Sequence, residues 1–264
     1  MNPQGQAPTT LFEFPLNERF RTYLRLESLY ARWQSLLLDC AAQSHHTALL
    51  TLFELFEYAF RYDVKGDLLT DLNRCKQTLE RFRDLPGLSE EKLKQSLFRI
   101  EDAQRQVEKS PKFGSNLADN EWLFNVKTRM VLAGGVCSFD VPFYYQWLQY
   151  TPDSRVQDLE SWITPMLPMF DALKLLMMMA RETCKQMQCV STDKAYQQPL
   201  NGQKFDLMQV QYSSLSAYIP DISANKHVIW LRFALPTYRG QPSRPNADLG
   251  VNEIPFDLKL CGLF

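Results

Sequence analysis

The spacing of apolar residues changes once along this chain, and that change limits the possible fold more than any other feature. As far as Cys189, apolar positions recur every three or four residues, which is typical of helices with one buried face. From Phe205 to Tyr212 apolar and polar residues alternate, which is typical of a strand. We therefore expect an α+β fold, in which a mainly helical bundle precedes a small antiparallel β-domain.

The first helix is predicted from Phe20 onward, with Asn17 as its N-cap and with Tyr23, Leu26 and Trp33 on the buried face. The same reasoning predicts further helices. Single helices are expected at about 47–62, 119–131 and 140–150. Two antiparallel helices are expected on either side of Pro86-Gly87, the second capped by Ser89. Thr151-Pro152 opens one more helix, and Thr164-Pro165 opens a last, long and Met-rich one.

The C-terminal third contains the strand signals. Asn201-Gly202 predicts a hairpin turn, and further strands are expected at 228–233 and 256–260. The short apolar run Leu11 to Phe14, stopped by Pro15, is long enough only for an edge strand, which can fold back onto that sheet. The expected organisation is a leader with an N-terminal strand at 1–15, a helical domain at 16–190 and a β-domain at 191–264.

Composition excludes several classes of protein. The 29 basic residues nearly cancel the 30 acidic ones, so no global field draws the chain to nucleic acid or to an anionic membrane. The first ten residues lack a signal-peptide pattern, and no apolar run approaches the roughly 20 residues of a membrane span. We expect a cytoplasmic protein whose six dispersed cysteines are reduced and buried.

One turn crowds together residue types that catalyse reactions in other proteins. The segment 134–142 reads Gly-Gly-Val-Cys-Ser-Phe-Asp-Val-Pro, and Cys137 in it suggests a thiol enzyme as an alternative function. The favoured interpretation is structural: the two glycines end a helix with positive φ, Cys137 and Phe139 pack inward, and Asp140 caps the next helix, with Pro142 in its first turn. No metal-ligand spacing and no glycine-rich phosphate loop is present, so no metal and no cofactor is expected.

Basic residues recur near the predicted ends of elements. Arg21, Arg25 and Arg32 share one side of the first helix, away from its aromatic stripe. If the sheet packs against the first helices, these residues could converge with others in a cleft suited to a peptide carboxylate or an acidic tail. The others flank the second helix or lie at a strand: Arg61, Lys65, Lys226, His227 and Arg232.

The start, the central turn and the C-terminal strands of the chain carry a resemblance to a known family. Residues 11–18 read Leu-Phe-Glu-Phe-Pro-Leu-Asn-Glu and are followed by Arg-Thr-Tyr-Leu-Arg-Leu-Glu at 21–27, and this start resembles that of the cell division protein ZapD family. The turn at 134–142 is similar to the Gly-Gly-x-Cys-Ser-Phe-Asp-x-Pro turn of that family, and Trp147-Leu148 follows it at a similar distance. Residues 218–223 and 256–258 are similar to its C-terminal strands.

This resemblance implies a homodimer without enzymatic activity that associates with the tubulin-like GTPase FtsZ at the mid-cell ring. Family members take the C-terminal tail of FtsZ through basic residues and bundle its filaments, which carries over to Arg25, Arg61 and Arg232 here. The sequence departs from the family at Glu121, Tyr145 and Val228, where basic residues or histidine are expected in close relatives, and in a longer Pro-rich insertion at 236–245.

Overall fold

The protein divides into two units, and each is described by itself. The computed structural model describes residues 8–81, 89–131, 137–214, 216–235, 237–238, 241–242 and 253–263. One unit comprises Thr22–Met177, and the other joins Met1–Arg21 to Met178–Phe264. The divisions fall inside two helices, whereas the sequence placed boundaries after residues 15 and 190.

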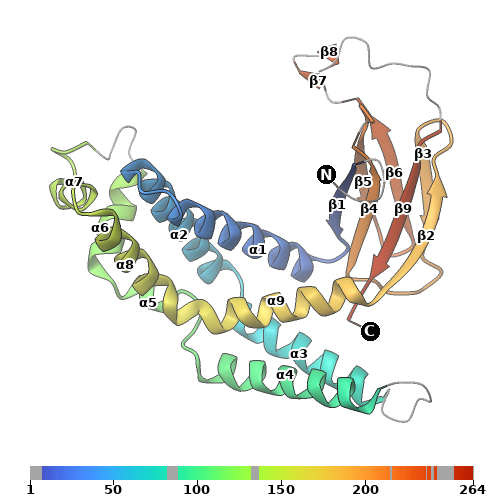
Figure 1. Cartoon of the computed structure of the whole chain (residues 1–264), viewed down its shortest axis with the longest axis horizontal. Helices are drawn as coiled ribbons and strands as arrows, with labels where there is room; N and C mark the ends of the chain where they lie inside the picture. Colours follow the sequence, from blue (N-terminus) through green and yellow to red (C-terminus); the bar gives the residue numbers. More distant parts are fainter. Residues whose placement is uncertain are drawn as a thin grey trace. The chain divides into compact units, whose positions relative to one another are not determined.

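The helical unit follows the predicted order of helices (Figure 1). Its second helix begins five residues before the predicted start, and a one-turn helix precedes the predicted helix at 119–131. The elements are α1 (Glu18–Leu37), α2 (Ala42–Arg61), α3 (Val64–Arg81), α4 (Glu90–Lys109), α5 (Ser115–Ala118), α6 (Glu121–Met130), α7 (Pro142–Leu148), α8 (Pro152–Ile163), the 3₁₀ turn η1 (Thr164–Met166) and α9 (Leu167–Glu182).

Three predicted helix caps are confirmed. The side-chain oxygen of Asn17 accepts a hydrogen bond of 2.9 Å from the backbone N–H of Phe20. Ser89 and Thr151 cap α4 and α8 in the same way, each by accepting from the backbone N–H three residues later. Local side-chain chemistry therefore fixes where these three helices begin.

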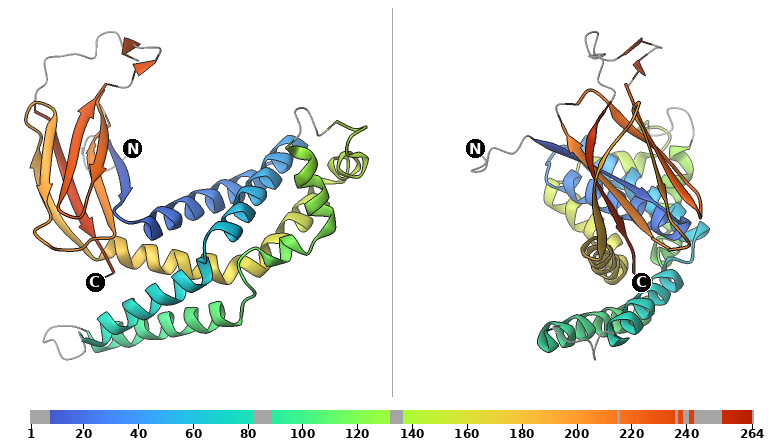
Figure 2. Two further views of the ribbon diagram at one scale, coloured as in Figure 1. Left: turned by 180° about the vertical axis from the view of Figure 1, so that it is seen from behind. Right: turned by 90° about the vertical axis from the view of Figure 1, so that its right-hand side faces the viewer.

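The predicted antiparallel pair is α3 and α4, which lie side by side in both Figure 1 and Figure 2. Lys65, near the start of α3, donates hydrogen bonds of 2.8 and 2.6 Å to the carbonyls of Glu108 and Ser110, where α4 ends. This cation satisfies carbonyl groups that the end of a helix leaves without partners. The predicted turn at Pro86-Gly87 lies outside the described residues.

One helical stretch, Pro152–Glu182, is long and apolar enough to cross a membrane by length and composition alone. No such stretch was predicted from the sequence. It comprises α8, η1 and α9, and 56% of its most apolar window is buried inside the protein. Met166, Met169 and Met177 are fully or almost fully buried. This burial is typical of a core helix, as the Met-rich segment was predicted to be.

The β unit is built from two antiparallel sheets that enclose one core (Figure 1). Met208, Val210 and Tyr212 from one sheet and Ile229, Leu231 and Phe233 from the other lie in that core, as the alternation predicts. One sheet has the order β1 (Thr9–Pro15), β4 (Leu207–Ser213), β9 (Pro255–Cys261) and β2 (Cys184–Val190), and the other has the order β3 (Ala195–Pro199), β6 (Val228–Ala234) and β5 (Ile219–Ala224). The short strands β7 (Thr237–Tyr238) and β8 (Gln241–Pro242) pair with each other.

The N-terminal strand does join this sheet, as predicted, because β1 pairs with β4 at its edge. The turn at Asn201-Gly202 is also present, with positive φ at both residues. It is not a hairpin turn, however, since β3 and β4 belong to different sheets. Turn chemistry is local, whereas the pairing partner of a strand depends on the whole sheet.

The prediction that all cysteines are reduced and buried is wrong. Cys184 and Cys261 form a disulfide, and their Cα atoms are 4.1 Å apart at directly opposed positions of β2 and β9. Cys40 and Cys137 are exposed, whereas Cys75 is buried. The bonded cysteines are 77 positions apart in the sequence, and no spacing pattern indicated the pair, because only the strand register brings them together.

The turn before α7 also differs from its prediction. Cys137 is exposed and the Phe139 side chain is 80% exposed, so neither packs inward. The N-cap of α7 is Val141, which makes no side-chain cap, rather than Asp140, whereas Pro142 does lie in the first turn. Gly134 and Gly135 lie outside the described residues.

A buried polar cluster connects the start of α2 to α8. The guanidinium of Arg155 is buried, and its Nε donates a hydrogen bond of 2.9 Å to Nδ1 of His45, which is fully buried. Burial lowers the pKa of the His45 imidazole, and the positive charge of Arg155 lowers it further. The neutral imidazole is the form that can accept this hydrogen bond.

We expect this histidine to make folding stability pH-dependent. The folded-state pKa of His45 is below the unfolded value of 6.5. The contribution of the neutral imidazole to the free energy of unfolding is therefore complete above pH 6.5 and is lost as pH falls through the folded pKa. The loss should approach about 1.4 kcal/mol per pH unit between the two pKa values. In urea unfolding at pH 7.5 and 5.5, His45→Gln should lose less stability than the wild type, whereas the exposed control His227→Gln should match the wild type. An equal loss in all three proteins would contradict the prediction.

Candidate partner-binding site

The last two turns of α2 present one continuous face. Glu54, Tyr58 and Tyr62 follow one another at intervals of four residues, and so do Glu57 and Arg61, so that all five lie on neighbouring positions of the helix surface. Together with one residue of α1 they line a pocket of about 230 Å³. The α1 residue is Arg25.

The register between α1 and α2 places the two predicted arginines at this pocket. Arg32 of α1 contacts Glu54 of α2, with 2.5 Å between nitrogen and oxygen. Arg25 lies seven residues before Arg32 and Arg61 lies seven residues after Glu54, which is about two helical turns in each case. In antiparallel helices these two steps lead in the same direction, so the arginines share one pocket.

The basic groups outnumber the carboxylates around the pocket. Glu57 takes a hydrogen bond from the Lys127 ammonium, and Arg61 approaches the same carboxylate at 3.8 Å with 72% of its side chain exposed. Arg25 is exposed and makes no ion pair with any residue that the structure describes. With Arg32 on Glu54, four cations surround two carboxylates, which leaves a local excess of positive charge.

The Glu57 carboxylate stays ionised to a lower pH than an ordinary glutamate, because its pKa is lowered. The hydrogen bond from Lys127 lowers the pKa of Glu57, and the charges of Lys127 and Arg61 lower it further. Lys127 is itself fixed, since its ammonium lies 4.4 Å from the ring centre of the buried Phe56. The Glu57 carboxylate is therefore paired with a cation that is itself packed against α2.

Two tyrosines supply the apolar part of the pocket. The rings of Tyr58 and Tyr62 are stacked, with centroids 5.5 Å apart and planes inclined by 24°. Tyr62 is the C-cap of α2, and its backbone N–H donates to the carbonyl of Tyr58 at 3.0 Å. The end of the helix thus holds both rings in place beside the arginines.

Two of the other predicted site residues are engaged within the protein. Lys65 bonds the carbonyls at the end of α4, as described above, and so is committed to the helix pair. Arg21 belongs to the β unit, where it contacts Glu18 at 3.2 Å and lies 5.8 Å from the centre of the Phe14 ring.

The remaining predicted residues lie on β6 and the turn before it. Lys226 and His227 are exposed in the tight β5–β6 turn, where the side-chain oxygen of Asn225 accepts from the backbone N–H of His227 at 2.8 Å. Arg232 is exposed on the outer face of β6, four residues beyond Val228, or about 13 Å along the strand. The strand therefore separates Arg232 from the turn residues instead of clustering them.

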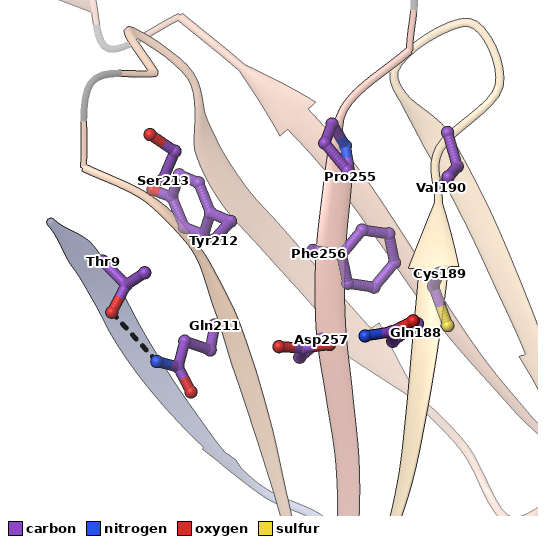
Figure 3. A pocket seen from close by; sticks show the side chains of 10 residues that line it. All are labelled: Thr9, Gln188, Cys189, Val190, Gln211, Tyr212, Ser213, Pro255, Phe256 and Asp257. Atoms are coloured by element: carbon purple, nitrogen blue, oxygen red, sulfur yellow. Dashed lines mark hydrogen bonds between the residues drawn. The ribbon is translucent and has the colours of Figure 1, made fainter. Parts of the chain in front are cut away.

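A second hollow, of about 470 Å³, lies on the outer face of the four-stranded sheet (Figure 3). Gln211, Asp257 and Gln188 stand in one row across β4, β9 and β2, and Gln211 donates a hydrogen bond of 2.9 Å to Thr9. The hollow contains none of the predicted basic residues, and its charged lining group is a carboxylate. It does not suit an acidic ligand.

Sequence reasoning missed the tyrosines and glutamates of the α2 pocket. The sequence predicted a helix at about 47–62, but only Arg61 near its end was proposed as a site residue. The repeat of Glu54, Tyr58 and Tyr62 at four-residue intervals was a usable signal. It predicts a polar and aromatic stripe on the face opposite to buried Leu49 and Phe56.

The exposed thiol of Cys137 is the feature on which the alternative enzyme reading depends. Two of the three histidines that could serve as its base are engaged within the protein. His45 accepts from Arg155, and Nδ1 of His46 shares a hydrogen bond with the Tyr144 hydroxyl.

The fold and the pocket together define an α+β protein whose candidate site is a basic and aromatic surface for an acidic ligand. Residues 24–232 match the ZapD family, described as a cell division protein, which is more than three quarters of the chain. The chain therefore belongs to the ZapD family of cell division proteins. The matched range includes the whole α2 pocket.

Proposed function

We propose that this protein is a non-enzymatic, cytoplasmic cell-division factor that binds the C-terminal tail of FtsZ and, as a homodimer, bundles FtsZ filaments at mid-cell. Membership of a cell-division family supports a role at the division site. The observation that carries the proposal is the α2 pocket, where Arg25 and Arg61 are exposed beside stacked tyrosines. Arg232, exposed on the β unit, is proposed as an additional cationic contact for the same acidic partner.

The energetics of such a site suit a filament cross-linker. An exposed contact between arginine and carboxylate contributes only about 0.2 to 1 kcal/mol, so one tail binds weakly. A dimer offers two sites to a filament that displays many tails, and linked binding of this kind can exceed single-site affinity by about 10² to 10⁴. Bundling then requires no strong individual contact.

Light scattering of polymerising FtsZ tests partner and activity together. Addition of this protein should raise the scattering of full-length FtsZ filaments and leave filaments of tail-deleted FtsZ unchanged. A third filament, whose tail keeps its length but has its acidic residues changed to amides, is the matched control and should also fail to respond. Equal bundling of the tail-deleted filaments would show that the tail is not the site of attachment.

A further inference from the structure

The arginines of the α2 pocket attract any carboxylate, whatever residue lies beside it. The pocket is not lined by charge alone, however, since Tyr58 and Tyr62 form part of the same wall as Arg25 and Arg61. Aromatic side chains next to arginine are the combination enriched at the energetic centres of protein interfaces. The aromatic rings therefore add a second means of recognition, distinct from charge.

The two rings are ordered before any ligand arrives. They stack on each other with 5.5 Å between centroids, and the C-terminal end of α2 holds both of them. Tyr62 remains 38% exposed. A tyrosine has few rotatable bonds, so a ring that is already held in place loses little conformational entropy when a ligand packs on it.

The size of the pocket indicates what fits beside these rings. Its volume of about 230 Å³ is smaller than the roughly 300 to 1,000 Å³ of sites for small molecules. Such a space suits one or two side chains of a bound peptide, whereas a whole cofactor or metabolite exceeds it.

The carboxylates of the pocket disfavour a purely acidic ligand. Arg25 makes no ion pair with a described residue, but Glu54 and Glu57 already hold Arg32, Lys127 and, at longer range, Arg61. The first carboxylate of a ligand is attracted by the exposed Arg25 and Arg61. Further carboxylates are repelled by Glu54 and Glu57. Such repulsion is a common source of specificity.

We propose that the α2 pocket recognises two side chains on the same face of an extended peptide: one carboxylate, bound by Arg25 and Arg61, and one aromatic ring, packed on Tyr58 and Tyr62. In an extended chain such side chains are two residues apart. This inference rests on the proposed function, in which the pocket takes an acidic tail. It adds that acidity is insufficient and that an aromatic residue two positions from the acidic one determines which acidic segment binds.

Fluorescence anisotropy with synthetic peptides tests the inference. The probes are two labelled peptides of equal length and charge, one with phenylalanine two positions from its aspartate and one with alanine there. The wild-type protein should bind the phenylalanine peptide up to about tenfold more tightly, which corresponds to about 1.4 kcal/mol, the upper end of the contribution of an aromatic pair. Tyr58→Leu and Tyr62→Leu should remove this preference, and Tyr62→Phe should retain it.

Tyr150→Leu is the matched control, because Tyr150 is also exposed in the helical unit but lies outside the pocket. It should bind both peptides as the wild type does. Equal affinity of the wild type for the two peptides, with binding still abolished by Arg25→Glu, would overturn the aromatic inference and leave the proposed function intact. Failure of both peptides to bind, together with bundling that does not depend on the FtsZ tail, would overturn both.

Discussion

Arg25→Glu and Arg61→Glu should each abolish co-sedimentation of the protein with FtsZ filaments while leaving its dimeric state unchanged. Arg25 and Arg61 are exposed at the same pocket, so that reversing either charge replaces attraction for a carboxylate by repulsion. In Arg61→Glu the new carboxylate also joins Glu54 and Glu57. Loss of about tenfold in affinity for each tail becomes about a hundredfold for an attachment through two tails.

Arg105→Glu provides the control for these variants. Arg105 is a comparably exposed arginine on α4 that pairs only with nearby Asp102, at 3.0 Å, among the ion pairs of the described residues. This variant should co-sediment as the wild type does at moderate salt, and sedimentation velocity should show an unchanged dimer for all three. Bundling retained by both pocket variants would rule out the pocket as the tail site.

The largest loss of stability is expected from Arg155→Met. The buried guanidinium donates to His45 and also to the carbonyls of Cys40, Leu148 and Tyr150, with 3.0 Å to Cys40 and 3.1 Å to Leu148. Methionine fills similar volume but leaves these acceptors buried without donors. Each buried acceptor left without a donor costs about 1 to 3 kcal/mol, so loss of all four donors should cost on the order of 4 kcal/mol or more.

Urea unfolding measures this loss directly. Arg155→Lys should fall between the wild type and Arg155→Met, because an ammonium cannot reproduce the planar fork of a guanidinium. Arg105→Met on the exposed face of α4 should change stability by no more than about 0.5 kcal/mol. A loss below about 1 kcal/mol in Arg155→Met would contradict the role of this cluster in holding α2 to α8.

The helices and strands could be predicted from the sequence because their signals are local. Asn17 and Thr151 each cap a helix through a backbone N–H only three residues away. The alternation of Met208, Val210 and Tyr212 specifies which face of β4 enters the core of the β unit without reference to the neighbouring strands. Such features depend on spacing and on side-chain chemistry, and both are written in the sequence.

The features that the sequence did not predict depend on contacts between residues that are far apart in the chain. His45 and Arg155 are 110 positions apart, and no spacing rule connects them. The exposure of Phe139 depends on how its turn projects from the bundle, which the composition of the turn does not encode. Likewise, Arg25 and Arg61 line one pocket because of the register between α1 and α2, which the sequence does not specify. These two residues were predicted from the resemblance to a family.

The central claim is that the carboxylates of the FtsZ tail contact the arginines of the α2 pocket, and a charge exchange tests it most directly. The isolated tail peptide is titrated by calorimetry into the wild type and Arg61→Glu, and the titration is repeated with a peptide whose acidic residue is changed to lysine. We predict that Arg61→Glu binds the natural peptide about tenfold more weakly than the wild type does. The variant should recover part of that affinity with the lysine peptide. Equal binding of the natural peptide to both proteins, with no gain from the exchange, would contradict the account.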